Sequence, residues 1–85
     1  MAKSYNLVYS ETAADFHLRL SKRRLSPLLY DFRKLAENPN IRSDYRVQDN
    51  EGREVEHLLV GDFVVSYWPD HAVSEIRIVE ITDVS

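Results

Sequence analysis

Residues 54–68 read EVEHLLVGDFVVSYW, and this stretch decides the fold. The segment 54–60 partly alternates apolar and polar residues, and the Gly61-Asp62 pair that follows is typical of a tight turn. The segment 63–68 is almost continuously apolar and aromatic, which favours a central strand covered on one or both faces. We therefore expect a hairpin of two antiparallel strands at the centre of a sheet.

Further strand-like segments lie on both sides of this hairpin. Upstream, a short run over residues 45–49 ends at Asn50-Glu51-Gly52-Arg53, which is a strong turn signal. Downstream, Pro69-Asp70-His71 predicts a turn before a last strand over residues 76–81. Residues 5–10, with the sequence YNLVYS, predict one more strand at the beginning of the chain.

Two helical patterns separate the first strand from the others. Ser10 and Thr12 are both suitable N-caps for the first helix, and the second is expected to begin with Ser26 as N-cap and Pro27 at its first position. Asn38-Pro39-Asn40 predicts its end. Apolar residues at steps of three and four predict one buried stripe on each helix, formed by Ala13, Phe16 and Leu20 and by Leu28, Phe32, Leu35 and Ala36.

The order of these elements predicts an α+β fold with two layers. Short turns make consecutive strands antiparallel neighbours, and both helices must bury their stripes against the same sheet. We expect an N-terminal strand, then an antiparallel helical hairpin packed on one face of a mostly antiparallel sheet of four or five strands. A chain of 85 residues has room for one domain, so we assign residues 1–85 to a single unit.

The composition excludes several classes of protein. The sequence has no cysteine, so no disulfide framework or thiolate metal site is available. His17, His57 and His71 are scattered without the spacing of metal ligands, and we expect neither a metal nor a cofactor. No apolar run approaches the roughly 20 residues that span a bilayer, and the first residues do not resemble a signal peptide. We expect a cytoplasmic protein without membrane contact.

Charge is unevenly distributed along the chain. Residues 1–42 contain eight Lys and Arg against four Asp and Glu, whereas residues 43–85 contain three against ten. The helical half is therefore net positive by four and the sheet half net negative by seven, which together give the net charge of −3. Either the helical half suits an anionic partner, or the charges only keep the two surfaces solvated.

The chain resembles the RelE/ParE superfamily of toxins from type II toxin–antitoxin systems. The opening strand over 5–10, the apolar positions of the two helices, the Asn38-Pro39 helix end and the segment 60–68 are similar to that family's first strand, helical hairpin, Gly-turn and central strand. The resemblance covers nearly the whole chain. It implies the two-layer fold, a cognate antitoxin partner, and one of two targets: messenger RNA on the ribosome, or DNA gyrase.

Two positions depart from the family pattern. The family's usual basic pair after the last strand corresponds here to about Thr82-Asp83-Val84, and its arginine after the central glycine corresponds to Asp62 or Phe63. Both departures remove positive charge where a phosphate would sit.

Chemistry on RNA would therefore have to use other residues. Phosphodiester cleavage needs a group that takes a proton, a group that returns it, and cations for the charged transition state. The sheet half offers His57, Tyr67 and Arg77 for these roles. The alternatives are a half-exposed strand histidine, a core tyrosine, and an arginine that pairs with nearby acids.

Other cations are candidates for binding RNA or a protein partner. The strongest group is Lys22-Arg23-Arg24 between the two helices, and Arg46 and Arg53 lie in the sheet half. The first group is equally well explained as a solvated helix terminus, and Arg53 as a cross-strand ion pair.

These observations leave two functional hypotheses. The first is the toxin of a toxin–antitoxin system that acts as a ribosome-dependent mRNA endoribonuclease with an atypical, weakly basic site. The second keeps the same fold as a non-catalytic protein-binding module, which either targets gyrase or is a degenerate toxin held by an antitoxin-like partner. The acidic sheet half favours the second, because it repels an RNA backbone at low salt.

Overall fold

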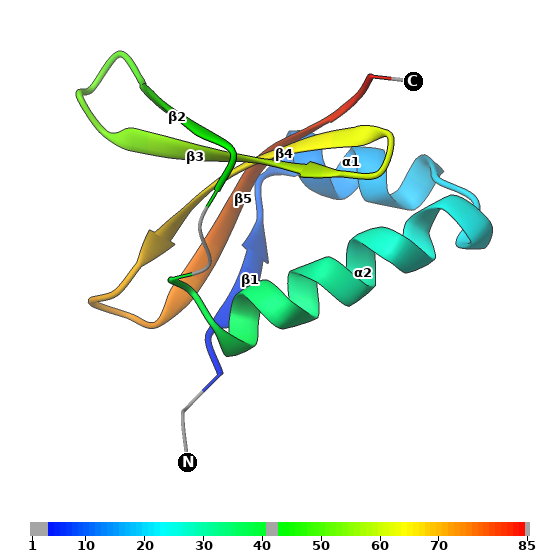
Figure 1. The fold of residues 1–85 in the computed structure, drawn as a ribbon, viewed down its shortest axis with the longest axis horizontal. Helices are drawn as coiled ribbons and strands as arrows, with labels where there is room; N and C mark the ends of the chain where they lie inside the picture. Colours follow the sequence, from blue (N-terminus) through cyan, green and yellow to red (C-terminus); the bar gives the residue numbers. More distant parts are fainter. Residues whose placement is uncertain (1–3, 41–42, 85) are drawn as a thin grey trace.

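The computed structural model describes residues 4–40 and 43–84, which form five strands and two helices (Figure 1). Their order along the chain is β1 (Asn6–Tyr9), α1 (Glu11–Arg19), α2 (Lys22–Glu37), β2 (Tyr45–Gln48), β3 (Glu54–Val60), β4 (Phe63–Asp70) and β5 (Glu75–Asp83). The strand, helix, helix, four-strand order confirms the predicted α+β class.

All five strands belong to one sheet with the spatial order β1-β5-β4-β3-β2. The strands from β2 to β5 are joined by tight turns and pair antiparallel, and β1 lies parallel to β5. A parallel pair cannot be joined by a tight turn, and here β1 and β5 are separated along the chain by both helices and by the other three strands. β4 is the middle strand, as its apolar sequence predicts, and β1 and β2 form the two edges.

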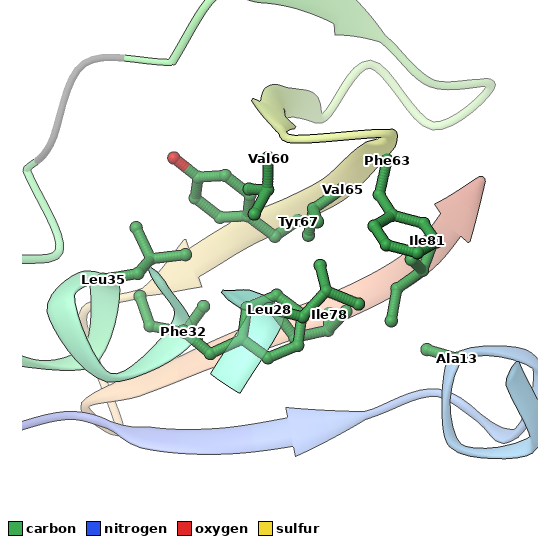
Figure 2. Close-up of a cluster of buried hydrophobic side chains, with 11 residues drawn as sticks. Ala13, Leu28, Phe32, Leu35, Val60, Phe63, Val65, Tyr67, Ile78 and Ile81 are labelled. Atoms are coloured by element: carbon green, nitrogen blue, oxygen red, sulfur yellow. The ribbon is translucent and has the colours of Figure 1, made fainter. Parts of the chain in front are cut away.

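Both helices lie on the same face of the sheet and bury their predicted apolar stripes there. Leu28, Phe32 and Leu35 of α2 are fully buried, and Phe16 and Leu20 pack half-buried against the same core. Figure 2 shows the three buried side chains of α2 beside residues of the sheet, among them Val60, Phe63, Val65, Tyr67, Ile78 and Ile81. We call this side of the sheet the helix-covered face. Neither helix in the described part of the chain has the length and apolar character needed to cross a membrane.

An irregularity in β5 sets which of its side chains face the helices. Ser66 of β4 pairs with Glu80, whereas the next residue, Tyr67, pairs with Ile78, so Val79 is an extra residue in β5. This bulge places both Ile78 and Ile81 in the core, although they are three residues apart. It explains why the alternation of apolar residues is interrupted in the sequence.

The start of α2 differs from the sequence expectation. The helix begins at Lys22 with Ser21 as N-cap, so Ser26 and Pro27 lie inside it rather than at its start. Ser21 Oγ accepts a bond from the backbone N–H of Arg24 at 3.4 Å. Both serines are suitable caps, and the half-buried Leu25, which packs on the core, favours the earlier start.

Two of the predicted turns form where the sequence indicates, and a third begins later than predicted. Gly52 and Gly61 have φ angles of 79° and 58°, the left-handed region that their turns require. The turn predicted at residues 69–71 begins later, because β4 continues through Pro69 to Asp70. Pro69 pairs with Ile76 of β5, while the ladder to β3 ends at Tyr67, so the missing N–H of the proline leaves no bond unmade on that side.

Candidate functional site

The second face of the sheet is covered by neither helix, and we call it the open face. Cross-strand partners share a face, which places Tyr45, His57, Ser66 and Glu80 in one row across four strands. Val8, Arg77 and Trp68 form a second row across three strands. Val79 lies at the bulge, and the hollows on both of its sides are partly lined by its side chain.

His57 is fixed in position by two neighbours. Its ring stacks on Tyr45 with 4.5 Å between centroids and 4° between planes. Its Nδ1 lies 3.0 Å from the hydroxyl oxygen of Ser66. With Nδ1 engaged, Nε2 is the nitrogen left for a substrate. A hollow of about 190 Å³ lies beside this group and is lined in part by Val47, Val79 and Glu80.

Trp68 lies between two guanidinium groups on the same face. The Arg53 carbon Cζ is 4.5 Å from the ring centroid, and that of Arg77 is 5.5 Å away. Arg53 comes from the turn before β3, Trp68 from β4 and Arg77 from β5, so the three side chains form a stack over two strands and this turn. A second hollow of about 220 Å³ is lined by this stack together with Val8 and Val79.

Both arginines of the stack are already paired with carboxylates. Arg53 lies 2.6 Å from Glu51 and 3.7 Å from Asp49. The other guanidinium, of Arg77, lies 2.8 Å from Glu75 and 3.6 Å from Asp70. Together with Glu80, five carboxylates and two guanidinium groups lie on or beside the open face. The formal charge of the open face, from five carboxylates and two guanidinium groups, is therefore −3.

Tyr67 does not lie with His57 and Arg77, which corrects the expected catalytic group. Its side chain is 1% exposed on the helix-covered face, because neighbouring residues of β4 point to opposite sides. Burial, reinforced by the carboxylate of Glu56, raises the pKa of Tyr67 to about 12, against a lowering by Arg46. The phenol therefore stays protonated at neutral pH and has no access to a substrate.

Arg46 also belongs to the other side of the sheet. It pairs across the β2–β3 ladder with Glu56, with 2.9 Å between Nε and Oε1, and lies 3.8 Å from Glu54. Of the two sheet cations predicted to bind RNA or a partner, only Arg53 is therefore on the open face.

The basic group Lys22-Arg23-Arg24 lies in the first turn of α2 and not at the end of α1. The dipole explanation for a helix terminus therefore fails, because cations are unfavourable at the positive N-terminal end. Arg24 is held by Asp83 at 2.8 Å, and its Cζ lies 4.9 Å over the ring of Phe63. Lys22 and Arg23 are exposed and make no ion pair with another described residue.

The sequence indicated His57, Arg77 and Arg53 as candidates, and the structure places all three on one face, but their neighbours Ser66 and Trp68 were missed. Ser66 and Trp68 are two residues apart in a strand, which predicts a shared face, and this signal was hidden by the apolar character of the whole run. In the described part of the chain, no group of three His, Asp or Glu side chains is placed to hold a metal ion.

Comparisons with known proteins give structural likeness only. No protein-family model matches the sequence, and no curated protein matches it. A chain of the RelBE2 toxin–antitoxin complex of Mycobacterium tuberculosis is 16% identical, with a TM-score of 0.76 over 94% of this chain and 98% of that one. A chain of the archaeal RelE–RelB complex of Pyrococcus horikoshii is 15% identical, with a TM-score of 0.76 over 96% and 97%.

A chain of the RelBE toxin–antitoxin complex of E. coli is also similar, with 13% identity and a TM-score of 0.69 over 96% of this chain and 99% of that one. At these identities the likeness concerns the fold. The chain therefore has the RelE-like fold that its sequence pattern predicts, over nearly its full length.

Proposed function

We propose that this chain, acting as one cytoplasmic domain over residues 1–85, is the toxin member of a toxin–antitoxin pair and acts by binding a protein rather than by cutting RNA. The observation that supports the toxin role is the fold shared, end to end, with chains of three toxin–antitoxin complexes. Its first partner is then a cognate antitoxin.

The pairing of charges favours binding over catalysis. Cleavage of a phosphodiester needs cations that are available to the phosphate. On this sheet Arg46, Arg53 and Arg77 each lie within 4 Å of two carboxylates. The positions where the family usually has basic residues contain Asp62 and Asp83 instead. An RNA backbone approaching the open face would have to displace the carboxylates of Arg53 and Arg77 and would meet excess negative charge.

RNA cleavage is the second candidate, and the geometry of His57 is the observation that favours it. Ser66 holds Nδ1, so Nε2 is free to take the proton of a ribose 2′-hydroxyl. The 2′-oxygen would attack the phosphorus to form a 2′,3′-cyclic phosphate, and the 5′-oxygen of the next nucleotide would leave and take up a proton from solvent or from the protonated imidazole. Arg77, on the same face, would have to release Glu75 before its guanidinium stabilised the phosphorane.

Induced expression of the wild type and of His57→Ala separates the two candidates. The binding proposal predicts that both arrest growth equally and leave messenger RNA intact, since the histidine takes part in no chemistry. Mapped RNA ends that increase with the wild type and disappear with His57→Ala would replace it with the catalytic account. His17→Ala, on α1 and away from the open face, is the matched control.

A gyrase supercoiling assay then identifies the target. Inhibition by the purified chain, relieved by the antitoxin, assigns DNA gyrase. Unchanged supercoiling and undisturbed growth, together with a stable antitoxin complex, assign a degenerate toxin that is held by its partner without acting on gyrase.

A further inference from the structure

We infer that the open face is the seat of a basic amphipathic helix of the partner, a helix with an apolar stripe bordered by Lys and Arg. The inference rests on the proposed function in one respect, since the helix is assigned to the antitoxin-like partner. The apolar and basic character of the helix, however, is inferred from the exposed side chains and the charge of the open face.

The open face has apolar side chains that neither helix covers. Tyr45, Val47 and Val79 are 48%, 51% and 39% exposed; the first two lie on β2 and the third on β5. The two hollows of about 190 Å³ and 220 Å³ border Val79 on its two sides. Side chains at steps of three and four on a helix have the spacing to enter two such neighbouring hollows.

A helix is the element that fits this surface. In a two-layer fold one sheet face is buried by side chains of packed helices, as α1 and α2 do on the helix-covered face, and a helix laid on the open face would bury its apolar side chains in the same way. Five strands at about 4.8 Å spacing span about 19 Å, which a helix of about 13 residues crosses. An added strand would pair at the edges, β1 or β2, and would leave the open face uncovered.

The charge of the face selects a basic helix. Four of its five carboxylates share two arginines, and Glu80 has no cation partner in the described part of the chain. Glu80 lies at the hollow lined by Val47 and Val79, so an apolar side chain of the partner in that hollow brings a neighbouring Lys or Arg close to the carboxylate. A nucleic acid would be repelled by the open face, because its phosphates add negative charge to a face that already has an excess.

The fluorescence of a tryptophan can report on this binding. Trp68 is the only tryptophan, and it lies on the open face. Its fluorescence is measured while the full chain is titrated with two synthetic amphipathic peptides that share one Leu and Ala pattern, with Lys at all polar positions in one and Glu in the other. We expect saturable binding of the lysine peptide, weakened by salt, and no binding of the glutamate peptide. Equal affinity for the two peptides would overturn the inference.

A pair of matched charge variants tests whether the peptide binds on the open face. Glu80→Lys is expected to weaken binding of the lysine peptide by about five- to tenfold, because it turns an attractive pair into a repulsive one. Glu37→Lys makes the same charge change at an exposed position at the end of α2 and should leave the affinity within about twofold of the wild type. Equal losses for both variants would contradict the placement on the open face.

Val47→Asp separates apolar contact from attraction between charges. The substitution adds negative charge, so a purely electrostatic site would bind the lysine peptide more tightly. A helix seated on the apolar surface loses contact instead, and we expect weaker binding. Tighter or unchanged binding would contradict an apolar seat. Val47 is exposed on the edge strand β2, and circular dichroism checks that the variant is folded.

These results are separate from those on the proposed function. A chain that is toxic and neutralised by its partner, but whose complex is indifferent to Glu80→Lys, refutes the basic helix and leaves the toxin role intact. A chain without toxicity that still binds the lysine peptide on the open face refutes the toxin role and leaves the surface assignment intact.

Discussion

Tyr67 and Glu56 are cross-strand partners on the helix-covered face, and an oxygen of each side chain is buried without a hydrogen bond to any other described residue. For Tyr67 this oxygen is the phenolic hydroxyl, and for Glu56 it is Oε2. The other carboxylate oxygen of Glu56 accepts from Arg46 at 2.9 Å. The pair shows that this tyrosine serves the core: its ring fills space, while its hydroxyl contributes no bond.

Tyr67→Phe removes that hydroxyl and keeps the ring. Because an unpaired buried polar group costs about 1 to 3 kcal/mol, we expect the variant to be as stable as the wild type or more stable by about 1 kcal/mol. Urea unfolding followed by circular dichroism measures the difference. A loss of more than about 1 kcal/mol would show that the hydroxyl makes a bond in solution.

Stability should fall in alkaline solution because of the same residue. Burial and Glu56 raise the pKa of Tyr67 to about 12, against 10.0 for an exposed tyrosine. Between these values the unfolded chain releases the proton while the folded chain keeps it, so stability is fully present below about pH 10 and decreases by up to about 1.4 kcal/mol per pH unit above it. Burial also raises the pKa of Tyr9, which acts in the same direction.

Urea unfolding of the wild type and Tyr67→Phe at several alkaline pH values tests this linkage. The variant should lose stability less steeply, with Tyr9 responsible for part of the slope that remains. Identical slopes would mean that Tyr67 titrates alike in the folded and unfolded chains.

Ser10 should matter more for stability than Ser21, although both are N-caps. The hydroxyl of Ser10 accepts from the N–H of Ala13 at 3.0 Å and donates to the carbonyl of Val79 at 2.6 Å, which ties α1 to the bulge of β5. Among the described residues, the hydroxyl of Ser21 makes only the 3.4 Å cap bond. We expect Ser10→Ala to cost about 1 to 2 kcal/mol and Ser21→Ala about 0.5 kcal/mol, as measured by thermal unfolding. The reverse order would contradict this assignment.

Arg24 should be structural, in contrast to its two neighbours. It connects the first turn of α2 to Asp83 at 2.8 Å and lies over Phe63. Because the pair is partly exposed, we expect Arg24→Ala to cost only about 0.5 to 1 kcal/mol. Arg23→Ala should be neutral or slightly stabilising, since it removes a cation from a helix N-terminus. Equal effects of the two substitutions on urea unfolding would refute the distinction.

The layers of the fold could be predicted from the sequence, because each rests on a repeating pattern. The stripe that includes Leu28, Phe32 and Leu35 fixed the buried face of α2, and Gly52 and Gly61 fixed two turns. The start of α2 could not be predicted, because Ser21 and Ser26 are equally good caps and only the tertiary contacts of the first turn distinguish them.

The candidate site was predictable only in part. His57 was recognisable as a reactive side chain, but the face of Tyr67 was not, since the apolar run from Phe63 to Trp68 has no alternation. The bulge at Val79 also shifts β5 against β4, which no short pattern signals. The pairing of every sheet arginine with two carboxylates depends on cross-strand register, and it changes the interpretation of the site from phosphate chemistry to protein binding.

The toxin role is tested most directly by counting viable cells after induction of this chain, alone and together with its proposed antitoxin. Our account predicts that the chain alone reduces the count and that the partner restores it to the level of uninduced cells. Equal counts in both cultures, at matched amounts of folded protein, would contradict it.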